Sequence, residues 1–170
     1  MKALGLLSFL LVLFFVGCGG SADSRSAVKP AALTSGDECH LCGMLIQRFP
    51  GPKGQLVVQG DTVPRKFCST RDLFSYALQP EIRDRIAAVY VHDMGRNAWP
   101  KPDAGPDAFT DGRTAWYVVG HDRKGAMGHT LASFARRSDA EAFAAGHGGR
   151  ILGFDDITLA LLADLAPHGD

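Results

Sequence analysis

Two stretches of the chain share one pattern of apolar and polar positions. Each has short apolar runs of strand type around a part in which apolar residues recur at helical spacing. The strand-like runs lie at 56–61, 65–68 and 88–91 in the first stretch and at 116–122, 131–135 and 150–154 in the second. In both stretches a Phe, an Asp and an Ala follow one another at intervals of five residues. The pattern predicts an α+β fold made of a tandem pair of ββαβ repeats.

Capping and breaking residues set the expected limits of the helices. Ser69 or Thr70 can cap a first helix that Pro80 interrupts, and Ser138 can cap the helix of the second repeat. A last helix is expected over 157–165. The expected organisation is a first repeat at 37–94, a Pro- and Gly-rich linker loop at 95–112, and a second repeat with a C-terminal helix at 113–167.

The N-terminal segment has the pattern of a secretory leader. Its apolar run at residues 3–16 follows Lys2 and is shorter than the about 20 residues that a spanning helix needs. Gly17 and Cys18 follow the run directly, and a small residue before a cysteine at this distance resembles the bacterial lipobox. The resemblance implies a lipoprotein signal peptide at 1–17, lipidation of Cys18, and a lipidated flexible tether at 18–36. The alternative is a plain signal peptide with an incidental cysteine.

The overall composition excludes some classes of function. Eighteen Lys and Arg balance eighteen Asp and Glu, so the net charge is zero, which argues against a nucleic-acid binder. The chain is 46% apolar and 21% charged, which is ordinary for a globular protein. With Cys18 set aside, three cysteines remain, so they cannot all pair within the chain.

The strongest chemical motif is Cys39-His40-Leu41-Cys42-Gly43-Met44. Two thiolates three positions apart can bind one small ion when the chain turns between them, and Gly43 permits such a turn. The Met44 thioether completes a soft donor set that suits Cu(I). The same spacing also fits a redox pair, half a zinc site or a structural disulfide. Cys68, at the end of a predicted strand, is interpreted as a small buried apolar residue rather than a ligand, although with a histidine it could complete a zinc site.

A second candidate for metal binding is Met127 with His129. Small residues flank Met127 in a predicted turn, where it has no helix face to fill, so we expect an exposed thioether. If the segment is extended, both side chains leave the same face, and with a cysteine thiolate they form a low-coordinate Cu(I) site. The plainer interpretation of a methionine is that it fills the core. His92 is interpreted as a surface or structural histidine.

These residues together resemble the NosL family. The matching motifs are Cys39-x-x-Cys42-Gly43-Met44, Phe67-Cys68-Ser69-Thr70-Arg71-Asp72, Val91-His92-Asp93-Met94-Gly95, Ala115-Trp116-Tyr117-Val118, Gly125-Ala126-Met127-Gly128-His129 and Gly148-Gly149-Arg150. The resemblance implies a tandem ββαβ fold related in shape to an organomercurial lyase domain.

The resemblance also implies a function that is carriage rather than catalysis. It implies a periplasm-facing lipoprotein that delivers Cu(I) for the copper–sulfur centre of nitrous oxide reductase, with the reductase and the NosDFY membrane complex as partners. Gly19 stands where inner-membrane retention typically needs Asp, which by analogy implies an outer-membrane anchor. The expected ligands come from Cys39, Cys42, Met44, Met127 and His129. We expect a monomer or a weak homodimer.

Two other functions remain open from the sequence alone. The first is a thiol–disulfide oxidoreductase that uses Cys39 and Cys42. The acidic pair Asp37 and Glu38 argues against it, because neighbouring negative charge is expected to raise a thiol pKa. The second is a structural lipoprotein stabilised by zinc at the same cysteines.

Overall fold

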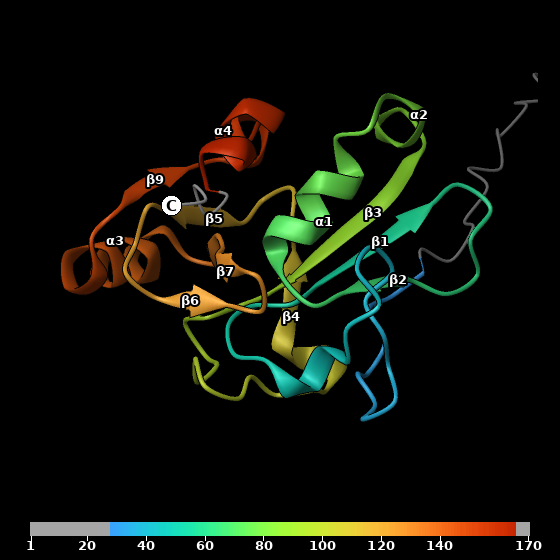
Figure 1. The fold of residues 1–170 in the computed structure, drawn as a ribbon, viewed down its shortest axis with the longest axis horizontal. Helices are drawn as coiled ribbons and strands as arrows, with labels where there is room; N and C mark the ends of the chain where they lie inside the picture. The colour runs from blue at the N-terminus through green and yellow to red at the C-terminus, as the bar shows by residue number, and fades with distance from the viewer. Residues whose placement is uncertain (1–27, 166–170) are drawn as a thin grey trace, which may run out of the picture.

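Two antiparallel sheets lie next to each other in the computed structural model, which describes residues 28–165 (Figure 1). The expected signal peptide and Cys18 lie outside the described residues. The first sheet has the order β2 (Arg65–Phe67), β1 (Gly54–Val58), β3 (Ile86–His92), β4 (Phe109–Asp111). The second has the order β8 (Ala132–Phe134), β5 (Trp116–Val119), β9 (Arg150–Leu152). A small hairpin of β6 (Lys124–Gly125) and β7 (Gly128–His129) connects β5 to β8.

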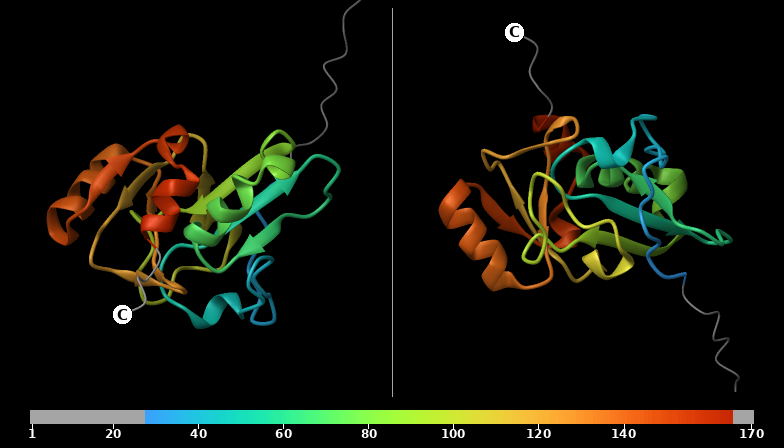
Figure 2. Two further views of the ribbon diagram at one scale, coloured as in Figure 1. Left: turned by 45° about the horizontal axis from the view of Figure 1, so that its top comes forward. Right: turned by 90° about the horizontal axis from the view of Figure 1, so that it is seen from below.

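The two halves have the same topology. In the first half the chain order is β1, β2, α1 (Thr70–Ala77), α2 (Pro80–Arg83), β3, and the sheet order is β2-β1-β3. In the second half the chain order is β5, β8, α3 (Arg137–His147), β9, and the sheet order is β8-β5-β9. Figure 2 shows α3 against the second sheet, and α1 between the first sheet and α4 (Leu159–Asp164). The predicted α+β tandem of ββαβ units is confirmed.

The helix starts match the sequence signals in the first half and depart from them in the second. The Ser69 hydroxyl caps α1 by accepting a hydrogen bond from the Asp72 amide at 3.0 Å. The expected cap at Ser138 is wrong, because α3 already begins at Arg137 with no side-chain cap. The last helix begins later than expected, at Leu159, because the chain first forms a 3₁₀ turn, η3 (Phe154–Asp156).

The segment at 95–112 does more than link the repeats. It contains a 3₁₀ turn, η2 (Pro106–Ala108), and then β4, which pairs with β3 from Asp111 opposite Tyr90 to Phe109 opposite His92. All the prolines of this segment, and its glycines except Gly112, precede this short strand. The backbone of β4 forms its hydrogen bonds with β3, which is distant in sequence, so the local sequence does not predict this strand.

The two repeats share one large core, and a second, smaller core lies at the second sheet. A large apolar cluster includes Leu56, Leu73 and Val89 from the first half and Tyr117 and Ile157 from the second. A smaller cluster lies between α3 and the second sheet, around Val118, Phe134 and Ala140. Tyr117 belongs to the large cluster and its neighbour Val118 to the small one, as the alternation of a strand requires. Strand β5 is therefore buried on both faces and joins the two cores.

Buried hydrogen bonds also tie the halves together. The Ser133 hydroxyl donates to the His92 carbonyl at 2.7 Å, and the Met94 amide donates to the Ser133 carbonyl at 2.8 Å. The Thr70 hydroxyl donates to the Leu131 carbonyl at 2.6 Å. Of the helices in residues 28–165, none has the length and apolar character to cross a membrane.

Candidate metal centre

Four donor side chains converge at one end of the first sheet. The sulfur atoms of Cys39, Cys42 and Cys68 and a carboxylate oxygen of Asp72 all lie within 4.8 Å of one another. The two sulfurs of Cys42 and Cys68 are 3.5 Å apart, and Asp72 Oδ2 is 3.5 Å from Cys39 Sγ and 3.4 Å from Cys68 Sγ. Within residues 28–165, this is the one group of three or more His, Cys, Asp or Glu side chains close enough to hold an ion.

Two of the donors come from a tight loop that the backbone closes on itself. The Cys39 amide donates to the Met44 carbonyl, and the Gly43 amide donates to the Cys39 carbonyl, each at 2.9 Å. Gly43 has φ +73°, which a residue with a side chain rarely adopts, so the glycine predicted to permit the turn does so. The His40 amide donates to the Lys66 carbonyl at 2.8 Å, which fixes the loop beside β2.

The other two donors come from the corner between β2 and α1. Cys68 follows the last residue of β2, and Asp72 lies in the first turn of α1, four residues further on. The Cys68 sulfur and Asp72 Oδ2 lie 3.4 Å apart, and the same oxygen is 3.5 Å from the Cys39 sulfur, so both side chains face the loop that carries Cys39 and Cys42. The Ser69 cap fixes the backbone of Asp72.

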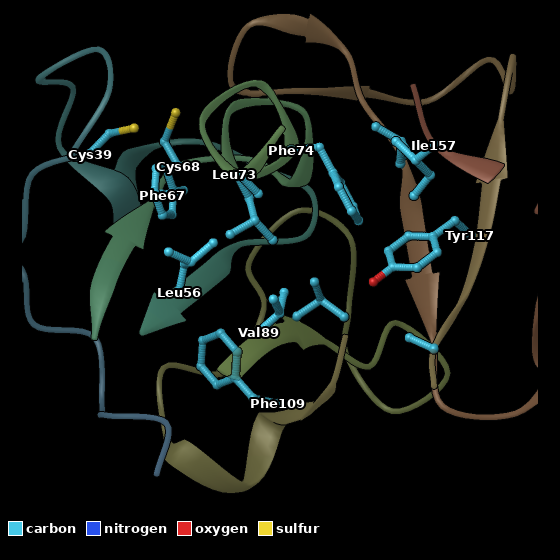
Figure 3. Close-up of a cluster of buried hydrophobic side chains, with 14 of the residues drawn as sticks. Cys39, Leu56, Phe67, Cys68, Leu73, Phe74, Val89, Phe109, Tyr117 and Ile157 are labelled. Carbon is cyan, nitrogen blue, oxygen red and sulfur yellow. The ribbon is translucent and has the colours of Figure 1, made fainter. Parts of the chain in front are cut away.

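The cluster is buried on one side and open on the other. Cys39 is 3% exposed and Cys68 and Asp72 are also buried, whereas Cys42 is exposed. Figure 3 shows the sulfurs of Cys39 and Cys68 at the edge of the large core, beyond Phe67. An ion that binds here reaches the buried donors past Cys42.

The three thiols of the cluster have very different pKa values. A hydrogen bond with Cys68 lowers the pKa of Cys39 to about 6, while the same pairing and burial raise the pKa of Cys68. Burial raises the pKa of Cys42 to about 11. The expectation that Asp37 and Glu38 raise the thiol pKa is therefore wrong for Cys39, and the Asp37 carboxylate pairs with Lys66 Nζ at 2.6 Å. The lowest thiol pKa in the metal-free cluster therefore belongs to the buried Cys39.

A buried lysine balances part of this negative charge. Lys53 is 2% exposed, and its ammonium donates to the carbonyls of Phe49 and Pro50 at 2.7 and 2.9 Å. Burial lowers the pKa of Lys53 to about 8, and electrostatic interaction with Cys68 and Cys39 opposes that shift.

The other metal ligands predicted from the sequence lie in two places, the cysteine loop and the β6–β7 hairpin. Met44 is half-buried at the end of the cysteine loop, where its carbonyl accepts from Cys39. Met127 is at the turn of the β6–β7 hairpin and is 43% exposed. His129 follows in β7, and its Nδ1 lies 3.2 Å from the Lys124 ammonium.

The hairpin is attached to the helix that carries Asp72. The Arg71 guanidinium donates to the Met127 carbonyl at 3.4 Å, and the Thr70 and Thr130 hydroxyls are 2.9 Å apart. The structure thus places the exposed thioether on the element next to the first turn of α1. His129 is not one of the four clustered donors.

Sequence reasoning missed two members of the cluster. Cys68 is buried, as expected, but its sulfur faces two other thiols instead of packing only as an apolar group. Asp72 was not considered as a ligand. The signal that could have identified both is the Cys-x-x-x-Asp spacing across a helix cap, directly after a strand. His92 is completely buried, so of the two roles considered it has the structural one.

Comparison with known proteins places these features in a family. Residues 30–162 match the NosL family. The chain is 49% identical over 166 residues to the copper-binding lipoprotein NosL of Stutzerimonas stutzeri, covering 96% of this chain and 85% of the relative. It is 36% identical to the copper-binding lipoprotein NosL of Achromobacter cycloclastes, over 82% of this chain and 73% of the relative.

A solved structure agrees with the sequence comparisons. The fold is similar to the crystal structure of the copper chaperone NosL from Shewanella denitrificans, with a TM-score of 0.75 and 49% identity. The similarity covers 78% of this chain and 98% of that one. The family match at 30–162 extends over strands and helices of both repeats.

Proposed function

The chain belongs to the NosL family, and we propose that it is a copper chaperone that binds Cu(I) through its clustered thiols and delivers it for assembly of the copper–sulfur centre of nitrous oxide reductase. The names of its relatives support copper carriage by a lipoprotein. The delivery step rests on the family resemblance of the motifs.

The observation that carries the proposal is the convergence of three sulfur atoms. Cys39, Cys42 and Cys68 lie within 4.8 Å of one another. Thiolates are soft ligands and select Cu(I) over hard cations, and Cu(I) is satisfied by two to four donors. The donor set therefore fits the ion, and the exposed position of Cys42 gives a recipient ligand a route to it.

Met127 and His129 are proposed as the ligands that hold copper while it passes to the recipient protein. Both lie on a hairpin that is attached to α1 and is more exposed than Cys39 and Cys68. A thioether is an uncharged ligand, so it binds Cu(I) more weakly than a thiolate does and can release the ion during exchange. Met44 is proposed as a further thioether on the cysteine loop.

The arrangement of pKa values favours carriage over thiol–disulfide catalysis. A thiol that attacks a substrate disulfide must be both exposed and deprotonated. In this cluster the thiol with the lowered pKa, Cys39, is buried, and the exposed Cys42 has a pKa raised to about 11. The cysteine pair is suited to binding an ion, because metal binding displaces the remaining protons.

The proposed setting is the periplasmic face of the outer membrane, with Cys18 as the lipid anchor. Nitrous oxide reductase and the NosDFY membrane complex are the proposed partners. These assignments rest on the lipobox and on the family resemblance of the motifs, and the word lipoprotein in the relatives' names supports the anchor.

Competition titration with variants tests the copper site. The reduced, metal-free chain from residue 19 onward keeps every described residue and is titrated with Cu(I) without oxygen against a chromophoric Cu(I) chelator. We expect tight binding that the Cys39→Ser/Cys42→Ser variant loses and that Met127→Ala weakens. Leu159→Ala, an exposed apolar residue on another helix, is the control and should bind as the wild type does. Retention of tight binding by a Cys39→Ser/Cys42→Ser/Met127→Ala variant would contradict the proposal.

A further inference from the structure

We propose that Trp99 is a positioning residue that holds the β6–β7 hairpin, and with it the Met127 thioether, in a fixed place beside the metal centre. Trp99 belongs to the 95–112 segment and does not bind the ion itself. Its role is to keep an exposed ligand where copper leaves the clustered thiols. This inference rests on the proposed function, in which Met127 is a copper ligand.

The hairpin is too short to fix its own position. Strands β6 and β7 pair at only two positions, whereas even a longer isolated hairpin is marginally stable in water. Met127 lies in the turn between the two strands, and its side chain is 43% exposed, so it does not anchor the turn. The place of the thioether is therefore set by the contacts that the rest of the protein makes with the hairpin.

The indole of Trp99 supplies one of these contacts. Its Nε1 donates a hydrogen bond to the Lys124 carbonyl in β6 at 2.8 Å. The indole is buried, stacks on Phe143 of α3 with ring centroids 5.6 Å apart, and meets the ring of His121 edge-on. Because these partners hold the indole in place, the first strand of the hairpin is attached to a rigid support.

Trp99 also fixes the hairpin relative to the cysteine loop. The chain leaves that loop through a 3₁₀ turn, η1 (Ile46–Arg48), and reaches Gly51, whose amide donates to the Trp99 carbonyl at 2.8 Å. Gly51 has φ +77°, and a Cβ there would lie 3.2 Å from Gly125 Cα and 3.3 Å from the indole. The glycine thus lets the segment after the cysteine loop pack directly against both Trp99 and β6.

The other side of the hairpin is attached to α1. The Thr130 and Thr70 hydroxyls are 2.9 Å apart, and the Arg71 guanidinium donates to the Met127 carbonyl at 3.4 Å. Thr70 and Arg71 directly precede Asp72 in the first turn of α1. The hairpin is therefore held between Trp99 and the helix that carries a member of the metal cluster. Loss of the Trp99 contact leaves the second attachment, so we expect a looser thioether rather than an unfolded protein.

Fixed placement matters because a thioether is a weak ligand. A ligand that the fold holds in place adds to binding directly, whereas a mobile one must first be ordered when the ion binds, which lowers the affinity. Loss of the indole N–H should therefore weaken the contribution of Met127 to Cu(I) binding and leave the thiols as they are. The largest possible effect is the one caused by removal of the thioether itself.

Methyl NMR of the methionines during addition of Cu(I) tests this role. Cu(I) is diamagnetic, so it shifts the methyl resonance of a bound thioether without paramagnetic broadening. Residues 19–170 contain three methionines, Met44, Met94 and Met127, and Met127→Leu assigns the resonance of interest. In the reduced, metal-free chain from residue 19 onward, Cu(I) should shift the Met127 methyl. In Trp99→Phe, which keeps an aromatic ring but has no N–H, the shift should be much smaller.

The affinity for Cu(I), measured in competition with a chromophoric chelator, completes the test. Trp99→Phe should weaken Cu(I) binding by at least about threefold, and by no more than Met127→Leu does. When Met127→Leu is added to Trp99→Phe, the affinity should fall further by less than about twofold, because the two changes remove the same contribution.

Two further variants keep the test decisive. Trp116→Phe is the matched control, because Trp116 lies on β5 with the Arg137 guanidinium 4.9 Å from its ring centroid. It should leave the Cu(I) affinity and the Met127 methyl as in the wild type. Gly51→Ala disturbs the same support from the side of the cysteine loop and should weaken Cu(I) binding in the same way. It decides the question if thermal unfolding shows that Trp99→Phe does not fold.

Each failure has a distinct meaning. A folded Trp99→Phe protein with the wild-type Met127 shift, or an affinity loss that adds fully to that of Met127→Leu, would overturn the role of Trp99 and leave the proposed function standing. A Met127 methyl that Cu(I) does not shift in the wild type would contradict both the role of Trp99 and the assignment of Met127 as a ligand. Tight Cu(I) binding that the Cys39→Ser/Cys42→Ser variant loses would in that case still support the thiol site.

Discussion

Mild acid should destabilise this protein through two buried histidines. His92 is completely buried and His121 is 2% exposed. Burial lowers the pKa of His92 to about 3, with the nearby charge of Lys53 acting in the same direction, and lowers the pKa of His121 to about 4. Both are neutral in the folded protein at pH 5, whereas in the unfolded chain a histidine with a pKa of about 6.5 is mostly protonated at that pH.

The sign and size of the effect follow from proton linkage. Because the unfolded chain binds more protons, stability falls as the pH falls below about 6.5 and continues to fall until the folded pKa is reached. From pH 7 to pH 5 each histidine lowers the free energy of unfolding by about 2 kcal/mol, or about 4 kcal/mol for both. Stabilised carboxylates such as Asp61 and Asp93 lose their contribution only near and below their ordinary pKa of 3.8, outside this window.

Urea unfolding at pH 7, 6 and 5 measures how the free energy of unfolding changes with pH. Asn at either position keeps an acceptor in place of the Nδ1 that accepts the amide of Lys53 (His92) or Arg123 (His121). His92→Asn and His121→Asn should therefore each remove about 2 kcal/mol of the stability lost between pH 7 and pH 5, whatever the effect at pH 7. Cys39, whose pKa is lowered to about 6, adds a smaller loss of the same sign that remains in the double variant. Wild-type stability that does not change between pH 7 and pH 5, or a pH dependence as steep in the double variant as in the wild type, would refute the reasoning.

Three further changes test the junction of the repeats, the second sheet and the start of the helix that carries Asp72, all by urea unfolding. Thr70→Val removes the buried hydroxyl that donates to the Leu131 carbonyl and should cost about 1–3 kcal/mol; no loss would mean that this bond does not join the repeats. Gly149→Ala should cost more than about 2 kcal/mol, because φ is +98° and the new Cβ would lie 2.5 Å from the Val119 carbonyl oxygen; wild-type stability would contradict that geometry. Ser69→Ala should cost about 1 kcal/mol as the cap of α1 is lost, and an unchanged unfolding curve would show that the cap is not needed.

The repeated fold could be predicted because its signals are local. Short apolar runs mark the strands, and the cap at Ser69 marks the start of α1. Strand β4 could not be predicted in this way. Its residues follow a Pro- and Gly-rich stretch, and they become a strand only through pairing with β3 from another part of the chain. The hairpin of β6 and β7 is equally short and is set by the turn at Met127.

The residues of the site also fall into those that the local sequence predicts and those that only the fold brings together. Cys39 and Cys42 are close in sequence and their spacing predicts a shared ion, whereas Cys68 joins them only because β2 runs beside their loop. Asp72 reaches the cluster through one turn of helix, a placement that depends on where α1 begins. The exposure of Met127 follows from its small neighbours, and its place near α1 follows from the fold.

The most direct test of the copper site is X-ray absorption at the copper K-edge of the anaerobic Cu(I) complex, prepared at one ion per chain. The three converging thiols predict Cu(I) in a shell dominated by sulfur, with at least two sulfur ligands, and a loss of sulfur in the Cys39→Ser/Cys42→Ser variant. A shell of nitrogen or oxygen in the wild type, or a sulfur shell unchanged in that variant, would contradict the assignment of copper to this cluster.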